Sequence, residues 1–262
     1  MVEKPVSNTS PDSPQRYQRL RIYNALMGLI HFVQGVVILV LATDFTLPVT
    51  TTFPAGPPGT PPSPPTTLFD VSIAWGVAAF FFLSAIAHWM VSLVVFPWYV
   101  TNLKLHRNYA RWIEYAFSST VMVVLIALLP GITEFAALIG LATANVSMIL
   151  FGLLQEKYEN PGSRGWLPFM FGCITGIAPW FAIGFYIWAP GSTVEPPGFV
   201  YAIFVSLFVC FNAFALNQWL QYKQVGKWRD YLFGETTYIT LSLVAKSALA
   251  WQVFAGTLTV VA

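Results

Sequence analysis

Seven long apolar segments limit what this chain can fold into. They cover residues 22–43, 71–95, 108–129, 132–154, 167–188, 198–222 and 236–259. Each is close to the roughly 20 apolar residues that a helix needs to cross a bilayer. Only 9% of the residues are charged, whereas soluble domains average about 25%, so lipid must be the main solvent. The sequence therefore predicts an all-α membrane protein, a bundle of seven transmembrane helices.

The remaining composition narrows the organisation of the chain. Residues 1–17 are polar and are expected to form a flexible tail without a cleavable signal peptide. Residues 18–262 then form the transmembrane domain. Cys173 and Cys210 both lie in apolar runs, which argues against a disulfide framework. A net charge of +2 is too small to favour a nucleic-acid partner.

The connection between the first two helices is unusual. Residues 46–68 contain eight prolines and no charged residue. One interpretation is a disordered or polyproline-type connector, which proline-rich tracts commonly form. The other is an ordered flap that covers the outer face or a partner subunit. The sequence leaves both interpretations open.

The Lys and Arg residues are distributed unevenly among the loops. Twelve of the thirteen lie in the amino-terminal tail and in the second, fourth and sixth interhelical loops with their flanks, and the other three loops hold none. Basic loops stay on the cytoplasmic side of a membrane. We therefore expect a multi-pass protein of the cell membrane with its amino terminus in the cytoplasm and its carboxy terminus outside.

The thirteenth basic residue, Lys246, lies in LSLVAKSALAW near the middle of the seventh segment. A lone charge at the bilayer centre costs roughly 2.5–3.5 kcal/mol on insertion scales. One interpretation is a lysine that is neutralised by its surroundings or paired only to hold helices together. The functional interpretation is favoured, because ionisable residues within membranes usually mark functional sites.

Glu114 is the acidic residue expected well inside a span. The other ten, including Glu156 and Glu235, are expected in loops, tails or helix ends. One buried anion and one buried cation predict an ion pair between Glu114 and Lys246. Glu114 and Lys246 lie roughly 9 and 15 Å beyond the expected starts of their helices, a difference in depth that the long lysine side chain can span. The lysine side chain also tilts back toward the start of its own helix.

A lysine amine in a desolvated pocket can form a Schiff base. If the carbonyl compound is retinal, visible absorption requires a protonated imine, and Glu114 is the candidate counterion. The hydroxyls of Ser242, Ser118 and Ser119 are expected near the pair. Aromatic residues in the fifth and sixth segments would suit a long apolar slot, but they would equally suit contact with lipid.

Two histidines, His31 and His88, are expected in the cytoplasmic half of the first two helices. Histidine titrates near neutral pH, so either could accept the imine proton after illumination. Each could equally be a neutral core histidine with a hydrogen-bond partner, since Gln34 lies one turn from His31 and Ser84 one turn from His88. These four side chains and Tyr115 are the candidates for a proton-accepting or polar site.

Five motifs together resemble one known family. They are HFVQGVVILVLATDF, RWIEYAFSSTVMVVLIA, NVSMILFGLLQEKY, PGFVYAIFVSLF and LSLVAKSALAWQVF, in the first, third, fourth, sixth and seventh segments. These motifs are similar to those of heliorhodopsins, a microbial rhodopsin family with inverted topology. The similarity covers nearly the whole chain after the tail.

The resemblance implies all-trans retinal on Lys246, Glu114 as its counterion, and Ser242 near the Schiff base. It places His31 and His88 in a polar cavity on the cytoplasmic side. It also implies a homodimer, a first loop with some β-structure and a slow photocycle. The residues that it places along the retinal are Met122, Met148, Phe211 and Gln218.

These observations favour a photoreceptor whose light-induced change is read by an unidentified cytoplasmic partner. The alternative is a light-driven proton or ion transporter. A pump needs proton-exchanging groups on both sides of the imine, and the outer half of the spans holds no carboxylate, histidine, lysine or arginine near mid-depth. No catalytic or metal-binding spacing is visible, which argues against an enzyme. Regulation of a bound soluble enzyme stays open, since basic loops could dock an acidic partner.

Overall fold

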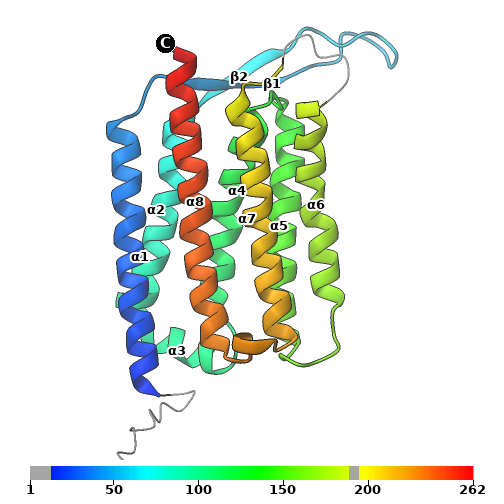
Figure 1. The fold of residues 1–262 in the computed structure, drawn as a ribbon. Coiled ribbons are helices and arrows are strands. Elements are labelled where there is room, and N and C mark those ends of the chain that lie inside the picture. Colours follow the sequence, from blue (N-terminus) through cyan, green and yellow to red (C-terminus); the bar gives the residue numbers. More distant parts are fainter. Residues whose placement is uncertain (1–12, 189–194, 262) are drawn as a thin grey trace, which may run out of the picture.

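The computed structural model describes residues 13–188 and 195–261, which form a bundle of long helices (Figure 1). Seven of the described helices are long and apolar enough to cross a membrane, so the chain is a multi-pass membrane protein as predicted. They are α1 (Pro14–Val40), α2 (Ile73–Trp89), α4 (Tyr109–Leu128), α5 (Phe135–Tyr158), α6 (Leu167–Trp188), α7 (Gly198–Tyr222) and α8 (Tyr231–Val261). The shorter elements are the π-helix η1 (Met90–Val94), the helix α3 (Phe96–Lys104) and the 3-10 turn η2 (Gly226–Arg229).

Helix α1 begins eight residues before the apolar segment does. Its first turns carry buried side chains at helical spacing, at Tyr17, Leu20 and Asn24, while Arg19 between them is exposed. This amphipathic pattern lets the helix continue past the apolar segment, because one face still packs on the bundle. The predicted flexible tail is therefore helical from residue 14, and its residues 1–12 lie outside the described part.

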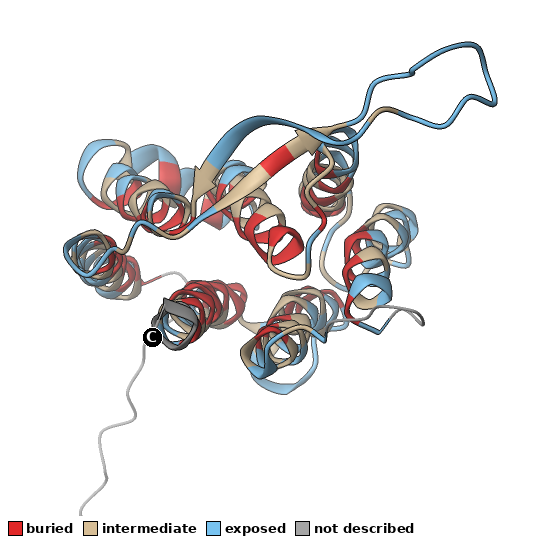
Figure 2. Ribbon diagram, turned by 90° about the horizontal axis from the view of Figure 1, so that it is seen from above, coloured by how far each residue is buried: buried red, intermediate tan, exposed pale blue. Residues whose placement is uncertain are grey.

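The helices follow one another around the bundle. α1 packs on α2, α2 on α4, α4 on α5, α5 on α6 and α7 on α8, and α8 closes the bundle against α1. Seen from above (Figure 2), buried side chains face the centre and exposed ones face outward. Many outward side chains are apolar, and Phe117, Phe181 and Val209 are each more than 60% exposed. A continuous apolar surface of this kind is expected where lipid covers the protein.

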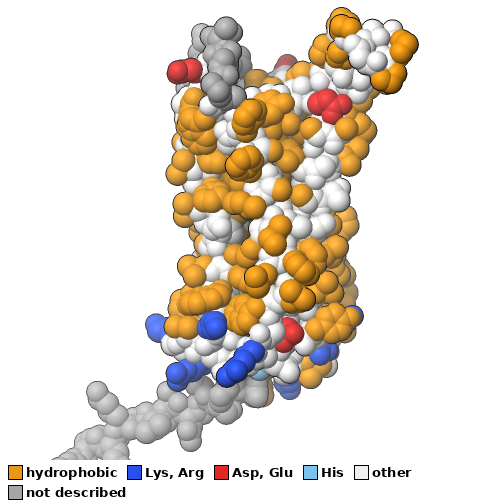
Figure 3. Space-filling model, turned by 90° about the vertical axis from the view of Figure 1, so that its right-hand side faces the viewer, with side chains coloured by type: hydrophobic (Ala, Val, Ile, Leu, Met, Phe, Trp, Pro, Cys, Tyr) orange, Lys and Arg blue, Asp and Glu red, His pale blue; other side chains and the backbone are white. Residues whose placement is uncertain are grey.

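The two ends of the bundle differ in charge. Figure 3 shows Lys and Arg gathered at one end of an apolar belt, and we call this the basic end. Its described basic residues are Arg16, Arg19, Arg21, Lys104, Arg107, Lys157, Arg164, Lys223, Lys227 and Arg229. The other two described basic residues, Arg111 and Lys246, are buried. The opposite end carries two strands and is called the hairpin end.

The hairpin consists of β1 (Thr46–Thr51) and β2 (Thr66–Ser72), which pair in antiparallel fashion. The backbone N–H of Thr50 donates to the carbonyl of Thr133 at 2.8 Å, and the two threonine hydroxyls are hydrogen-bonded at 3.0 Å. These contacts hold β1 on the turn between α4 and α5. The interpretation as a structureless connector is therefore wrong for the strands. Residues 52–65 between them are nearly all exposed and project away from the bundle (Figure 2).

Candidate functional site

The two charges that the sequence predicts to pair lie together in the centre of the bundle. Nζ of Lys246 on α8 is 3.2 Å from Oε1 of Glu114 on α4, and their side chains are only 4% and 9% exposed. The same amine donates to the hydroxyl of Ser242, one turn earlier on α8, at 2.8 Å. A lysine amine and a carboxylate therefore compensate each other where water is largely excluded.

A contact nearer the basic end sets the register of α4 against α8. The side-chain amide of Asn108, which precedes α4, donates to Oε1 of Glu235 on α8 at 2.5 Å. From this level Glu114 is six residues farther along α4 and Lys246 eleven residues farther along α8, which amounts to about 9 and 16 Å of rise. The long lysine side chain spans the difference because it slants toward the start of its helix.

Hydroxyl groups surround the carboxylate of Glu114. Ser84 of α2 donates to Glu114 Oε1 at 2.6 Å, and Ser118 is buried one turn after Glu114 on α4. Ser119, expected near the same pair, turns away instead. Its hydroxyl donates to the carbonyl of Tyr115 at 2.6 Å and accepts from Asn145 at 2.8 Å.

The two histidines are stacked, with ring centroids 5.5 Å apart. His88 Nδ1 is hydrogen-bonded to Asn24 Oδ1 at 2.8 Å. Ser84, which the sequence suggested as its partner, donates to Glu114 instead. His31 is fully buried, and neither ring nitrogen has a hydrogen-bond partner among the described residues.

Gln34 is not the partner of His31 that the sequence suggested. Its Oε1 accepts from the hydroxyl of Ser247 at 2.9 Å and from Nε1 of Trp251 at 3.1 Å. Gln34 therefore links α1 to α8 on the hairpin side of the Lys246 amine. Of the predicted polar set, His88 and Tyr115 line one small cavity, whereas Gln34 is not among its lining residues.

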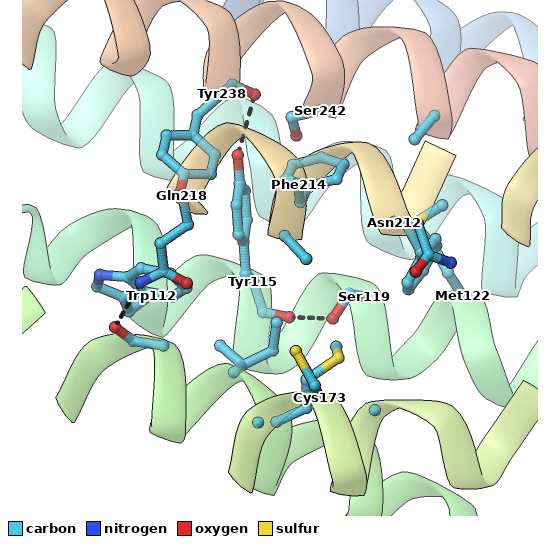
Figure 4. Close-up of a pocket in the computed structure, with 18 of the residues that line it drawn as sticks. Trp112, Tyr115, Ser119, Met122, Cys173, Asn212, Phe214, Gln218, Tyr238 and Ser242 are labelled. Atoms are coloured by element: carbon cyan, nitrogen blue, oxygen red, sulfur yellow. Dashed lines mark hydrogen bonds between the residues drawn. The ribbon is translucent and has the colours of Figure 1, made fainter. Parts of the chain in front are cut away.

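Lys246 lines a larger, mostly apolar cavity. The cavity lies between α4, α5, α6, α7 and α8 (Figure 4). Tyr115 stands across it, and its hydroxyl donates to the carbonyl of Tyr238 at 3.0 Å. Lys246 Nζ is 5.5 Å from the centre of the Tyr115 ring. The residues predicted from the sequence that line the cavity are Tyr115, Ser119, Met122, Met148, Phe211, Gln218, Ser242 and Lys246.

The shape of this cavity depends on small residues of α6 that face large ones of its neighbours. Gly172 and Gly176 line it, and a side chain on Gly176 would collide with the sulfur of Met148. Trp180 borders the same region and packs edge-on against Phe211, with ring centroids 5.3 Å apart. An elongated apolar molecule with a reactive carbonyl at one end would fit this arrangement, because the cavity wall is apolar and an amine lies at its end.

A second, smaller cavity lies on the basic-end side of the pair. Its polar and charged lining consists of Asn24, His88, Tyr99, Asn108, Arg111, Glu114, Tyr115, Glu235 and Ser242. Tyr115 and Ser242 line both cavities, so they separate the apolar space from the polar one.

Glu114 was expected to be the acidic residue well inside a span, but two further glutamates are buried. Arg111 forms salt bridges with Glu156 of α5 and Glu235 of α8, and all three side chains are at most 4% exposed. Both glutamates were expected in loops, tails or helix ends, and Glu235 lies in the second turn of α8, which begins at Tyr231. Local hydropathy could not find this cluster, because its members lie near helix ends and are buried only by neighbouring helices.

Other residues that line the two cavities were not predicted from the sequence. Trp112 and Tyr238 line the large cavity, and Asn24 lines the small one. The pair Gly172 and Gly176 had a usable signal, because two glycines four residues apart form a smooth face on a helix. Asn24 gave no comparable signal, because its partner His88 is distant in the sequence.

Comparison with known proteins shows the family to which the chain belongs. The family model described as Heliorhodopsin matches residues 20–258. A comparison with curated proteins gave no match.

Solved structures share the fold at low identity. A light-driven proton pump, LR (Mac), from Leptosphaeria maculans aligns with a TM-score of 0.63 and 14% identity over 94% of this chain and 98% of that one. The transmembrane domain of the Salpingoeca rosetta rhodopsin phosphodiesterase aligns with a TM-score of 0.63 and 11% identity over 91% and 83%. Cyanorhodopsin from the cyanobacterium Tolypothrix sp. NIES-4075 aligns with a TM-score of 0.59 and 13% identity over 90% and 93%. These likenesses show a microbial rhodopsin fold.

The buried pair can be tested by its energetics alone. Removing one charge leaves the other buried and unpaired, so Lys246→Met or Glu114→Gln alone should lower the free energy of unfolding by roughly 3–5 kcal/mol. The double variant should recover most of this loss. Thermal unfolding of the purified protein, without added ligand, measures both effects, and Lys104→Met at an exposed lysine is the control. Additive losses in the double variant would contradict the pairing.

Proposed function

The chain belongs to the heliorhodopsin family, and we propose that it is a light sensor that binds all-trans retinal covalently through Lys246, with Glu114 as counterion. The retinal supplies light absorption and a change of shape on illumination. The observation that carries the proposal is the position of Lys246, which lines a mostly apolar cavity while its amine lies 3.2 Å from the Glu114 carboxylate.

The protein supplies three things to this chromophore. Lys246 gives the point of attachment, and its nitrogen carries a positive charge that Glu114 compensates. Ser242 holds the lysine nitrogen, and Ser84 holds the carboxylate, by hydrogen bonds of 2.8 and 2.6 Å. The cavity excludes water from the rest of the ligand, because its wall is built from methionine, aromatic and glycine residues.

Replacing Lys246 tests the proposed function directly. Retinal added to the purified protein should give a visible absorption band, and Lys246→Ala should abolish it, because the other lysines that the structure describes are exposed at the basic end. The control is Lys104→Ala, which should colour like the parent protein. A coloured Lys246→Ala variant would place the attachment elsewhere.

Glu114→Gln tests the counterion. The substitution keeps the size and hydrogen-bonding capacity of the side chain but removes the anion that favours a cation on the Lys246 nitrogen. Loss of a stabilising anion disfavours the protonated form, so the pH at which the visible band disappears should fall by roughly 1–3 units. The band itself should move to longer wavelength, because the charge is no longer held at the nitrogen.

This titration should be recorded with and without halide, since chloride could replace the missing carboxylate. Glu195→Gln, at an exposed glutamate of the hairpin end, is the control and should behave like the parent protein. An unchanged band and an unchanged titration in halide-free buffer would show that Glu114 is not the counterion.

The proposal favours sensing over pumping. The buried ionisable groups of the described spans, His31, His88, Glu114, Lys246 and the Arg111 cluster, lie at or on the basic-end side of the Lys246 amine. The helices beyond it toward the hairpin end carry no Asp, Glu, His, Lys or Arg within the bilayer-spanning segments. Groups such as Gln34 and Ser247 accept and donate hydrogen bonds there but do not ionise.

Illuminated cells that contain the retinal-loaded protein should therefore show no pH change that an uncoupler abolishes. A light-driven proton pump expressed at the same level is the positive control. A clear uncoupler-sensitive signal would promote the transporter alternative.

We further propose that the basic end faces the cytoplasm and the hairpin end faces outward, since all exposed Lys and Arg of the described part lie at the basic end. A cysteine introduced at Thr60, in the exposed tip of the hairpin, should react with a membrane-impermeant reagent on intact cells. The matched cysteine at Asn160, in the connection between α5 and α6, should react only after lysis. The reverse pattern would overturn this orientation.

In this orientation the basic loops form the surface that a cytoplasmic partner would read, and an acidic partner would suit their charge. The homodimer that the family resemblance implies is part of the proposal. Crosslinking in membranes at low protein density should trap a two-fold species. Strictly monomeric protein would remove this part of the proposal and leave the chromophore site unaffected.

A further inference from the structure

The cluster around Arg111 does not balance in charge. One guanidinium meets the carboxylates of Glu156 and Glu235, and all three side chains are almost completely buried. With both carboxylates ionised, the cluster would carry one net negative charge. A buried net charge is costly, and no second Lys or Arg of the described residues forms a salt bridge with it. One additional proton would make the cluster neutral.

The hydrogen bonds identify which carboxylate is ionised. Glu156 Oε1 accepts from Arg111 Nη2 at 2.6 Å and from the Tyr231 hydroxyl at 2.8 Å. Its Oε2 accepts from the Asn108 backbone N–H at 2.9 Å and from the indole N–H of Trp112. All four partners point a donor at Glu156. A carboxylate with four donors has no lone pair free for a proton.

Glu235 has a different environment. Its Oε2 accepts from Arg111, and its Oε1 faces the Asn108 amide and, at 3.4 Å, the hydroxyl of Tyr99. A hydroxyl can accept as well as donate, so a protonated Glu235 can donate to Tyr99. Glu235 also lines the small cavity, whereas Glu156 does not.

We propose that Glu235 is a buried proton-storage site that is protonated in the dark, so that the Arg111–Glu156–Glu235 cluster is neutral. The proton on Glu235 faces the same small cavity as Glu114 and His88. When Glu235 gives up this proton to a base across the cavity, the O–H bond of the carboxyl breaks and the electron pair stays on Oε1. The cluster then carries one negative charge beside Arg111.

The groups that face Glu235 come from every element around it. They are Tyr99 of α3, Arg111, Glu114 and Tyr115 of α4, Glu156 of α5, His88 of α2, and Tyr231 and Tyr238 of α8 itself. His106 stacks on Tyr231 at the outer edge of the cluster, with ring centroids 5.0 Å apart, and is exposed to solvent. Arg111 is therefore the buried cation in direct contact with Glu235.

Infrared spectroscopy of the purified protein in the dark tests the proposal. At neutral pH the parent protein should show the carbonyl band of a protonated carboxylic acid, with the downshift that deuterium exchange produces. Glu235→Gln should lose this band, while Glu195→Gln should keep it. Glu156→Gln should also lose it, because Glu235 would then ionise as the single partner of Arg111.

Glu235→Asp keeps an acid at the site and should move the band rather than remove it, which covers the case in which Glu235→Gln does not fold. A parent protein without the band, or a band that survives in Glu235→Gln, would overturn the proposal. The spectra are recorded with and without added retinal. The band is expected in both preparations, so failure here is distinguishable from failure of the proposed chromophore site.

Discussion

A charge within the apolar part of this bundle is stable only beside a compensating group, and this requirement organises the centre of the molecule. Lys246 stays buried because Glu114 lies 3.2 Å away. That contact fixes the height of α8 against α4, and Ser84 extends it to α2. Nearer the basic end, Arg111 joins α4 to α5 and α8 through its two glutamates. Four of the seven spanning helices, α2, α4, α5 and α8, are thus aligned by contacts to charged groups, while apolar packing supplies contacts that are less specific in register.

The same requirement separates two kinds of space around Lys246. The apolar cavity ends at Tyr115 and Ser242, and the polar cavity begins at the same two side chains. Tyr115 is suited to this position because its ring contributes to the apolar wall while its hydroxyl bonds to the carbonyl of Tyr238. The proposed ligand on Lys246 would therefore have its apolar body in the apolar cavity and its attachment point beside the polar one.

The sequence predicted the features that depend on local composition. Seven apolar segments gave seven helices, and the isolation of Lys246 and Glu114 among apolar neighbours gave the central pair. The sequence did not predict side chains that are buried only by the arrangement of neighbouring helices. Glu235 belongs to a polar stretch and became a core residue because Tyr99 of α3 and Arg111 of α4 cover it. Likewise, the helical neighbours proposed for the histidines were one turn away, but the actual partner of His88 comes from another helix.

The two sides of Lys246 differ in the kind of polar group that they contain. From Lys246 toward the basic end there is a sequence of proton-exchanging groups, Glu114, His88 and Glu235, around one small cavity. Toward the hairpin end there are hydrogen-bonding groups that keep their protons, such as Gln34 with Ser247 and Ser206 with Gln252. The ionisable groups around the small cavity therefore lie on one side of Lys246. The elements that contact that side, α3 through Tyr99 and α5 through Glu156, also carry the loops of the basic end. The proposed light sensor would use these elements, because they connect the charged groups of the small cavity with the loops of the basic end.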